Sequence, residues 1–183
     1  MPGEKLLFPE SERLAFRAWE ERDWPFFAAM NANPQVMHFF PSVMTEEQSR
    51  SMWDRMRAEL EEKGYGLYAV ELKASGALIG LQGFHWADFE ADFTPCVEIG
   101  WRFMPEAWGH GYATEGAGAC LEHGFFRLGF DRVYSFTACV NLASEAVMKR
   151  AGMKRTGEFN HPNVAPDSAL YPHVLYVSEA PGR

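Results

Sequence analysis

Alternating apolar and polar residues predict a chain rich in strands. The clearest alternation covers residues 96–103, in which every odd-numbered position is apolar. A period of two places successive side chains on opposite faces of a sheet. Residues 67–72 and 78–86 are separated by a short segment with the turn residues of a hairpin. The expected strands cover residues 14–19, 67–72, 78–86, 96–103, 132–140, 153–159 and 173–177.

Apolar residues spaced three and four apart predict four helices. Thr45 and Gln48 match a capping box, and the apolar positions between residues 52 and 60 continue the helical period. Pro34 ends the first helix, because the residue before a proline disfavours the helical conformation. Gly152 closes the last one. The expected helices cover residues 20–31, 45–63, 112–128 and 142–151.

The order of these elements predicts the fold class. One strand and two helices precede three strands, after which helices and strands alternate. Neither repeats nor Pro/Gly-rich linkers divide residues 1–183, so we expect one α/β domain with a mixed sheet. The chemistry should lie where a strand, a loop and a helix meet within a parallel crossover.

Composition and charge exclude several classes of protein. Hydrophobic residues make up 47% of the 183 residues, which excludes a disordered chain. Seventeen basic and 25 acidic side chains give a formal charge of −8, without a Lys/Arg run, which speaks against a nucleic-acid partner. No window approaches 18 consecutive apolar residues, so we expect no transmembrane helix and no membrane partner.

Cysteine and histidine usage bears on compartment and metals. Cys96, Cys120 and Cys139 are odd in number and far apart, which favours a reducing compartment over a disulfide framework. Residues 1–9 lack the apolar core of a signal peptide, so we expect a cytoplasmic location. The six histidines include no HxxxH pair, and we expect no metal.

The segment between the strand at 96–103 and the helix at 112–128 carries the candidate chemistry. Gly109 and Gly111 precede the helix, whose first N–H groups lack internal partners and lie at the positive end of the helix dipole. This arrangement suits a phosphate, although a tight turn would also need two glycines. Tyr112 and Ala113 exclude a Walker A loop, and Thr114 stands where a Rossmann fingerprint needs its third glycine.

Residues 108–115, with the sequence WGHGYATE, resemble the acetyl-CoA pyrophosphate loop of the GNAT acetyltransferases, patterned Gln/Arg-x-x-Gly-x-Gly/Ala. Trp108 stands at the Gln/Arg position, as is common in the RimJ/RimL-like branch, the ribosomal-protein N-terminal acetyltransferase type. The resemblance runs from about residue 11 to residue 177. Other segments that agree with this branch are 12–14 with Arg17, 31–37, 98–101, 141–144 and 152–153.

The resemblance implies a fold and a co-substrate. The fold would be a single GNAT-like domain, whose mixed central sheet has a splayed parallel strand pair and helices on both faces. The co-substrate would be acetyl-CoA, whose pantetheine arm pairs with the strand like an added strand, and Gly100 would tolerate a bulge there. Asn141 would contact the arm, cap the following helix, or do both. The implied cofactor-binding residues are Phe103, Met104, Trp108, Gly109, His110, Gly111, Tyr112, Ala113, Thr114 and Asn141.

The resemblance also implies an acyl transfer from a thioester to an amine. Glu98 would act as a base through water, although a solvated carboxylate or an ion pair with Arg102 is an alternative reading. Many relatives protonate the leaving thiolate with a tyrosine that residues 142–151 lack. Ser144 is then the expected donor, unless its hydroxyl only bonds the backbone of the first helical turn.

The acceptor is expected to be a primary amine, in the first place the N-terminal amine of a protein or peptide. A small-molecule amine and a non-catalytic acetyl-CoA-binding module are the alternatives. Candidate walls of the acceptor pocket are residues 38–40, 85–86, 88–92 and 161–173, and no histidine among them is expected to be catalytic. The sequence neither requires nor excludes a homodimer.

Overall fold

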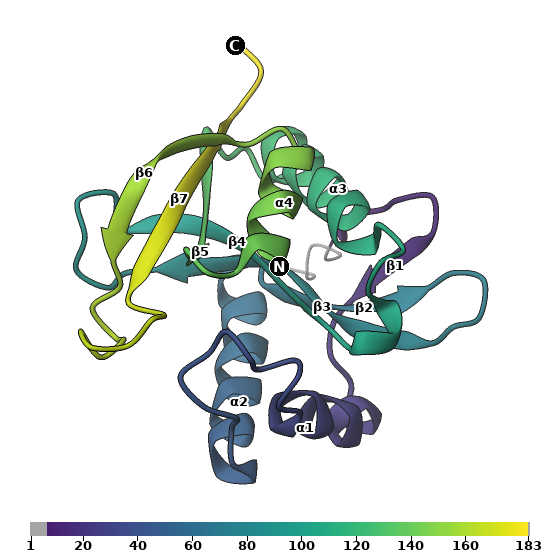
Figure 1. Ribbon diagram of the computed structural model, residues 1–183. Helices are drawn as coiled ribbons and strands as arrows, with labels where there is room; N and C mark the ends of the chain where they lie inside the picture. Colours follow the sequence, from purple (N-terminus) through teal and green to yellow (C-terminus); the bar gives the residue numbers. More distant parts are fainter. Residues whose placement is uncertain (1–6, 183) are drawn as a thin grey trace.

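A seven-stranded sheet in the order β1-β2-β3-β4-β5-β7-β6 forms the centre of the molecule (Figure 1). The structure is a computed structural model that describes residues 7–182. Residues 1–6, part of the segment that we expect not to be a signal peptide, lie outside the described residues. The strands are β1 (Leu14–Arg17), β2 (Leu67–Leu72), β3 (Leu78–Ala87), β4 (Cys96–Phe103), β5 (Arg132–Ala138), β6 (Lys154–Asn160) and β7 (Pro172–Glu179).

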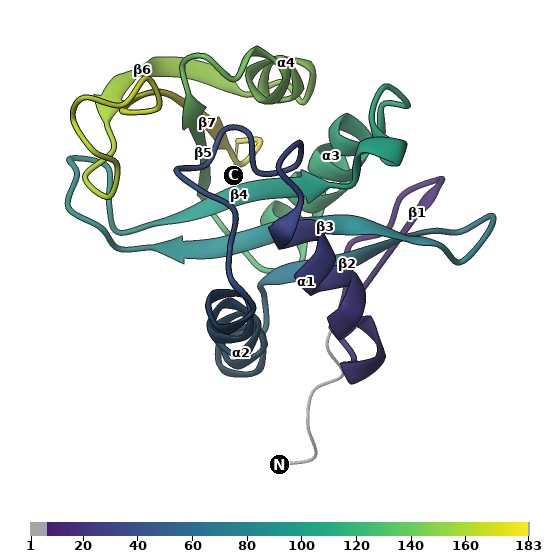
Figure 2. The ribbon, with the colours of Figure 1, turned by 60° about the horizontal axis from the view of Figure 1, so that its bottom comes forward.

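Helices cover both faces of the sheet. Helices α3 (Tyr112–Phe126) and α4 (Leu142–Arg150) lie on one face, whereas α1 (Trp24–Ala32) and α2 (Glu46–Lys63) lie on the other (Figures 1 and 2). This confirms the expected α/β fold with helices on both sides of a mixed sheet. None of the described helices combines the length and apolar composition that crossing a membrane requires.

The one parallel pair in the sheet joins β4 to β5. Its register contains a single residue pair, Glu98 with Tyr134, while all other neighbouring strands are antiparallel and pair over at least four residues. Strand β4 therefore separates from β5 beyond Glu98, as expected for a splayed pair. The expected bulge at Gly100 is wrong, because β4 pairs with β3 without interruption from Cys96 to Phe103.

The predicted elements are confirmed apart from their ends and the first helix. The segment 20–31 is a short 3-10 turn, Glu21–Asp23, followed by α1. Pro25 in the first turn of α1 explains the break, because proline suits the start of a helix and not its interior. Thr45 caps α2 through the predicted capping box, and Gly64 ends that helix with a φ of 73°.

Two hydrophobic cores hold the layers together. The larger core lies between the sheet and the pair α3/α4, where Ala117, Leu121 and Phe125 are buried as the helical period predicts. The smaller core lies between the sheet and α1/α2. Its centre is the fully buried Trp53, whose ring lies 5.3 Å from that of Phe27. Edge-on and tilted aromatic contacts of this kind add to the area buried.

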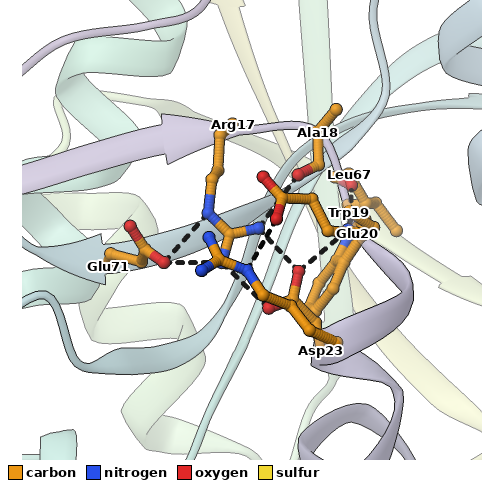
Figure 3. A network of polar contacts seen from close by, with 8 residues as sticks. Arg17, Ala18, Trp19, Glu20, Asp23, Leu67 and Glu71 are labelled. Atoms are coloured by element: carbon orange, nitrogen blue, oxygen red, sulfur yellow. Dashed lines mark hydrogen bonds and ion pairs between the residues drawn. The ribbon is translucent and has the colours of Figure 1, made fainter.

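A partly buried polar network joins β1 to the 3-10 turn before α1 and to β2. The Arg17 guanidinium donates to both carboxylate oxygens of Asp23, at 2.6 and 2.9 Å, and to Glu71 of β2 at 2.9 Å (Figure 3). Burial acts to raise the Asp23 pKa, but hydrogen bonds from Arg17 and from the Glu20 backbone outweigh it and lower that pKa. The Trp19 indole donates to the Leu67 carbonyl beside this network.

Candidate active site

The loop after β4 ends in two glycines that precede helix α3. Gly109 has a φ of 76° and Gly111 a φ of 79°, in the left-handed region that side chains disfavour. Gly111 is the N-cap of α3 and offers no side chain to the first turn. The N–H groups of that turn are thus left for an external anion, beside the exposed His110. The segment Gly109 to Thr114 has the geometry of an anion-binding site.

Arg13, just before β1, brings a positive charge to this loop. Its Nε donates to Glu115 at 2.6 Å, and its guanidinium lies 4.6 Å from the centre of the Tyr112 ring. Its Nη2 lies 3.7 Å from the position that a Cβ on Gly111 would occupy. Burial acts to raise the Glu115 pKa, but hydrogen bonds from Arg13 and Ser11 outweigh it and lower that pKa. Glu115 therefore stays charged and holds Arg13 beside the loop.

The backbone of β4 presents an open edge toward β5. Alternate residues of a strand direct their N–H and C=O groups to opposite neighbours. The Met104 N–H donates to the Ile79 carbonyl of β3 at 2.9 Å, and the Met104 carbonyl accepts from the Ala107 N–H in the turn after β4, also at 2.9 Å. The Met104 N–H therefore has a partner within the protein, and a contact between Met104 and a co-substrate stays a prediction. The backbone N–H and C=O groups of Trp101 and Phe103 instead point toward β5, on the side where the two strands have separated.

The side chains of the loop shape the same edge. The Trp108 indole donates to the Phe103 carbonyl at 2.9 Å, while 49% of the Trp108 surface stays exposed. This bond leaves the Phe103 N–H as the group available for an added strand. The rings of His110 and Tyr112 stack with centres 5.3 Å apart. The expected cofactor-binding residues around Trp108 are thus gathered on one surface between β4 and α3.

Asn141 and Ser144 lie where β5 passes into α4. Asn141 is the N-cap of α4: its Oδ1 accepts from the Ser144 N–H at 3.2 Å, and its Nδ2 donates to Thr137 at 3.0 Å. The capping role expected of Asn141 is therefore confirmed, whereas its contact with a pantetheine arm stays a prediction. The bond to the cap uses the backbone of Ser144 and not its hydroxyl.

Glu98 lies on β4 at the point where the parallel strands part. Burial, which disfavours its charged form, is the largest influence and raises its pKa to about 7, against the smaller lowering influence of His85. The alternative ion pair with Arg102 is not observed among the described residues, where Arg102 donates to Asn31 and lies over the Phe40 ring. Burial lowers the pKa of Arg102 to about 10. A carboxyl with a pKa near 7 can exchange protons at neutral pH.

His85 and Glu59 form a hydrogen-bonded pair beside Glu98. His85 of β3 is the cross-strand partner of Glu98. Its Nδ1 lies 2.8 Å from Glu59 Oε2 of α2, and the other oxygen of Glu59 accepts the Trp86 N–H at 2.7 Å. The hydrogen bond to Glu59 is the main cause of a raised His85 pKa. The imidazole is half-exposed to solvent and lies on the strand next to Glu98.

The segments expected to form the acceptor pocket fall into two groups, one near Arg102 and one at the loops that follow β3 and β6. Phe40 lies over the Arg102 guanidinium, with 4.5 Å between that group and the ring centre. Phe89 meets His161 with ring centres 4.6 Å apart, and His161 meets His173 at 4.9 Å. Segments 88–92 and 161–173 therefore come together.

The three cysteines form no disulfide and belong to no group of three potential metal ligands within residues 7–182. Cys96, Cys120 and Cys139 are free thiols there. Burial raises the pKa of Cys96 to about 12. No three His, Cys, Asp or Glu side chains of this part of the chain gather as ligands would.

A protein-family model decides the family. The model for the acetyltransferase (GNAT) domain matches residues 13–154. The chain belongs to the GNAT acetyltransferases. The uncharacterized N-acetyltransferase YnaD of Bacillus subtilis (strain 168) is 33% identical over 150 residues, which are 81% of this chain and 84% of YnaD.

Solved structures agree with the GNAT fold. An acetyltransferase (GNAT family) from Bacillus anthracis is 28% identical, with a TM-score of 0.77 over 94% of this chain and 98% of that one. RimL, the ribosomal L7/L12 alpha-N-protein acetyltransferase solved with coenzyme A, is 20% identical, with a TM-score of 0.75 over 94% and 97% of the chains. This last likeness supports the fold alone.

Sequence reasoning missed two features of this GNAT acetyltransferase. The position of Arg13 beside the glycine loop depends on a contact between residues more than 100 positions apart. The pair of His85 and Glu59 has a partial signal, because the hairpin register alone places His85 near Glu98. The periodicity of residues 45–63 predicts the helix that carries Glu59, but it does not tell which strand that helix packs against.

Proposed function

We propose that this GNAT enzyme transfers the acetyl group of acetyl-CoA to a primary amine, in the first place the N-terminal amine of a peptide. The observation that carries the proposal is the open edge of β4 between Glu98 and the glycine loop. It supports a linear arm that pairs with Trp101 and Phe103 while its diphosphate meets the first turn of α3.

The chain supplies several groups for the co-substrate. The N–H groups after Gly111 and the Arg13 guanidinium suit the negatively charged diphosphate, because hydrogen bonds to charged groups are the strong ones. The second Nδ2 hydrogen of Asn141, which the bond to Thr137 does not use, is the group we assign to the arm. These residues agree with coenzyme A as the ligand, as found in the RimL structure.

The pKa of Glu98 favours an α-amine as acceptor. An α-amino group has a pKa of about 7.7–8.0, whereas a lysine-type amine has a pKa of about 10.4. The pKa of Glu98, about 7, is close to that of an α-amino group and far below that of a lysine-type amine. A near match makes proton removal easy at neutral pH. Glu98 takes the proton, directly or through water, and His85 passes it to solvent.

The leaving thiolate needs a proton on the other side of the reacting carbon. Ser144 lies in the first turn of α4, next to the strand that forms the far wall of the gap, and its hydroxyl is not used by the helix cap. We assign it the role of donor to the thiolate. Its location also suits the positive end of the α4 dipole, which stabilises a thiolate.

Acetyl-CoA should stabilise the folded protein. Binding to the native state alone raises the free energy of unfolding by about 2.7 kcal/mol when the ligand is a hundredfold above its Kd. A thermal melt with saturating acetyl-CoA measures this rise, and desulfo-coenzyme A separates the contribution of the nucleotide from that of the thioester. An unchanged melting temperature in a folded protein would contradict the proposal.

The acceptor class follows from thiol release. A peptide with a free N-terminus should react, the same peptide with a blocked N-terminus should not, and a small amine such as butylamine should react more slowly. A preference for small amines would favour the alternative acceptor. Acetyl-CoA binding without thiol release from any amine would indicate a non-catalytic binding module.

Gly111→Val should weaken acetyl-CoA binding at least tenfold, equivalent to about 1.4 kcal/mol. The reason is torsional, since a Cβ there meets only the flexible end of Arg13, whereas the φ of 79° is unfavourable for valine. Loss of this φ turns the N–H groups away from the diphosphate. Calorimetry measures the affinity, with Gly118→Val on the exposed side of α3 as the matched control. Equal affinity for parent and Gly111→Val would reduce the loop to a tight turn.

A further inference from the structure

Six aromatic side chains form a cluster that belongs to neither hydrophobic core. Phe136 of β5 and Phe159 of β6 have ring centres 5.5 Å apart, and His173 of β7 lies 5.5 Å from Phe159. The loop between β3 and β4 adds two phenylalanines, and the residue after β6 adds an imidazole. We call this group the aromatic cluster: Phe89, Phe93, Phe136, Phe159, His161 and His173.

The aromatic cluster lies on the same face of the sheet as Glu98. Tyr134 pairs with Glu98 in the register of β4 and β5, and the Phe93 ring lies 5.6 Å from the Tyr134 ring. Phe136 follows two residues later, so it points to the same side, roughly 7 Å further along the strand. Ile99 and Val133 point the other way, into the core under α3 and α4. The cluster thus begins one side chain away from Glu98.

Every ring of the aromatic cluster is only partly buried. The contacts are close, for example 4.9 Å between the centres of Phe93 and Phe159, so the rings support one another and keep a defined surface. Contiguous apolar surface that stays accessible to solvent is a feature of binding sites, and the six rings supply such a surface. Its position beside Glu98 makes the acceptor the fitting occupant.

The charges around the cluster favour an acceptor that combines a protonated amine with an apolar group. Burial is the main cause of lowered pKa values in His161, to about 4, and in His173, so both imidazoles are neutral at pH 7. Between and beside the two loop phenylalanines, Asp88, Glu90 and Asp92 are exposed. A protonated amine is therefore attracted by the acidic loop, while uncharged rings receive the group attached to it.

A groove next to the aromatic cluster has room for the part of the acceptor that follows the bound ring. A depression of about 570 Å³ at the beginning of β4 and β5 is lined by Phe93 and Tyr134, together with Trp86 and Arg132. It meets the aromatic cluster at Phe93. A chain that continues from the bound group can follow this groove to solvent, as a peptide would need.

We propose that the acceptor carries an aromatic ring close to its reactive amine, as in a peptide beginning with Phe, Tyr or Trp, and that this ring binds against the aromatic cluster. The inference rests on the proposed function and adds the chemical class of the acceptor. The acidic loop steers the amine, the cluster holds the ring, and Glu98 receives the proton.

Peptides that differ only in their first residue test the inference. We expect kcat/KM for a Phe-first peptide to exceed that for an Ala-first peptide at least tenfold, mainly through a lower KM. In Phe136→Leu and Phe159→Leu, which keep apolar bulk but lose a ring, this ratio should fall to threefold or less. Phe126→Leu, a ring on α3 that is 67% exposed, should keep the parental ratio.

The outcomes separate the inference from the proposed function. Equal rates for Phe-first and Ala-first peptides, or a preference for a Lys-first peptide, would overturn the inference and leave acetyl transfer intact. An unchanged ratio in both leucine variants would also overturn it. Absence of thiol release with every peptide would refute the proposed function, and the inference with it. Calorimetry with acetyl-CoA verifies that each variant is folded and binds the co-substrate.

Discussion

Glu98→Gln lowers kcat/KM about a hundredfold at pH 6.5 in the reaction we propose, because general-base catalysis contributes about 10²–10⁴-fold. The deficit shrinks above pH 8, where an α-amine is neutral without help. The parent profile should rise through an apparent pKa near 7, the value that burial gives Glu98, and this inflection should be missing in the variant. Thiol release between pH 6 and 9 measures both profiles.

The control for this experiment is Glu62→Gln, which removes an exposed carboxylate from α2. It should keep the parental profile. Calorimetry should give equal acetyl-CoA affinity for Glu98→Gln and the parent, since Glu98 faces the acceptor. Coinciding profiles of Glu98→Gln and the parent would remove Glu98 from the mechanism.

Arg17→Met lowers the free energy of unfolding by about 3–5 kcal/mol, because it leaves the buried Asp23 without its partner. The exposed pair of Arg132 and Glu179 provides the matched control, and Arg132→Met should change stability by less than about 1 kcal/mol. Urea unfolding at pH 7 measures both. Equal losses in the two variants would mean that burial of the Arg17 network adds nothing.

The pH dependence of this difference has a definite sign. The pKa of Asp23 is lower in the folded protein than in the unfolded chain, where it is about 3.9. The stability that Asp23 contributes is therefore fully present above that value and is lost as the pH falls through the lower folded pKa. The gap between the parent and Arg17→Met should narrow on acidification.

Local signals predicted most of the fold. Thr45 and Gln48 specify the start of α2 through a capping box, and the period of two in residues 96–103 specifies β4. These signals involve neighbours in sequence, so they need no knowledge of the tertiary structure. The one local signal overlooked was Pro25, which indicates that α1 begins near residue 24 and not at residue 20.

The candidate site was less predictable because its geometry depends on distant contacts. The glycine loop could be located, but the engagement of Met104 with Ile79 becomes visible only when β3 and β4 are paired. The aromatic cluster combines residues from β5, β6, β7 and two loops. Segments 88–92 and 161–173 were expected near the acceptor, but their contact with Phe136 and Phe159 depends on the tertiary fold.

The single pairing of Glu98 with Tyr134 has a consequence for the whole molecule. The sheet consists of a four-stranded and a three-stranded part that share almost no backbone hydrogen bonds, and α3 contacts strands of both. A ligand arm that bonds to Trp101 and Phe103 extends the four-stranded part by one strand. In the proposed complex the co-substrate is then a piece of secondary structure, and its release leaves the backbone groups of Trp101 and Phe103 without that added strand.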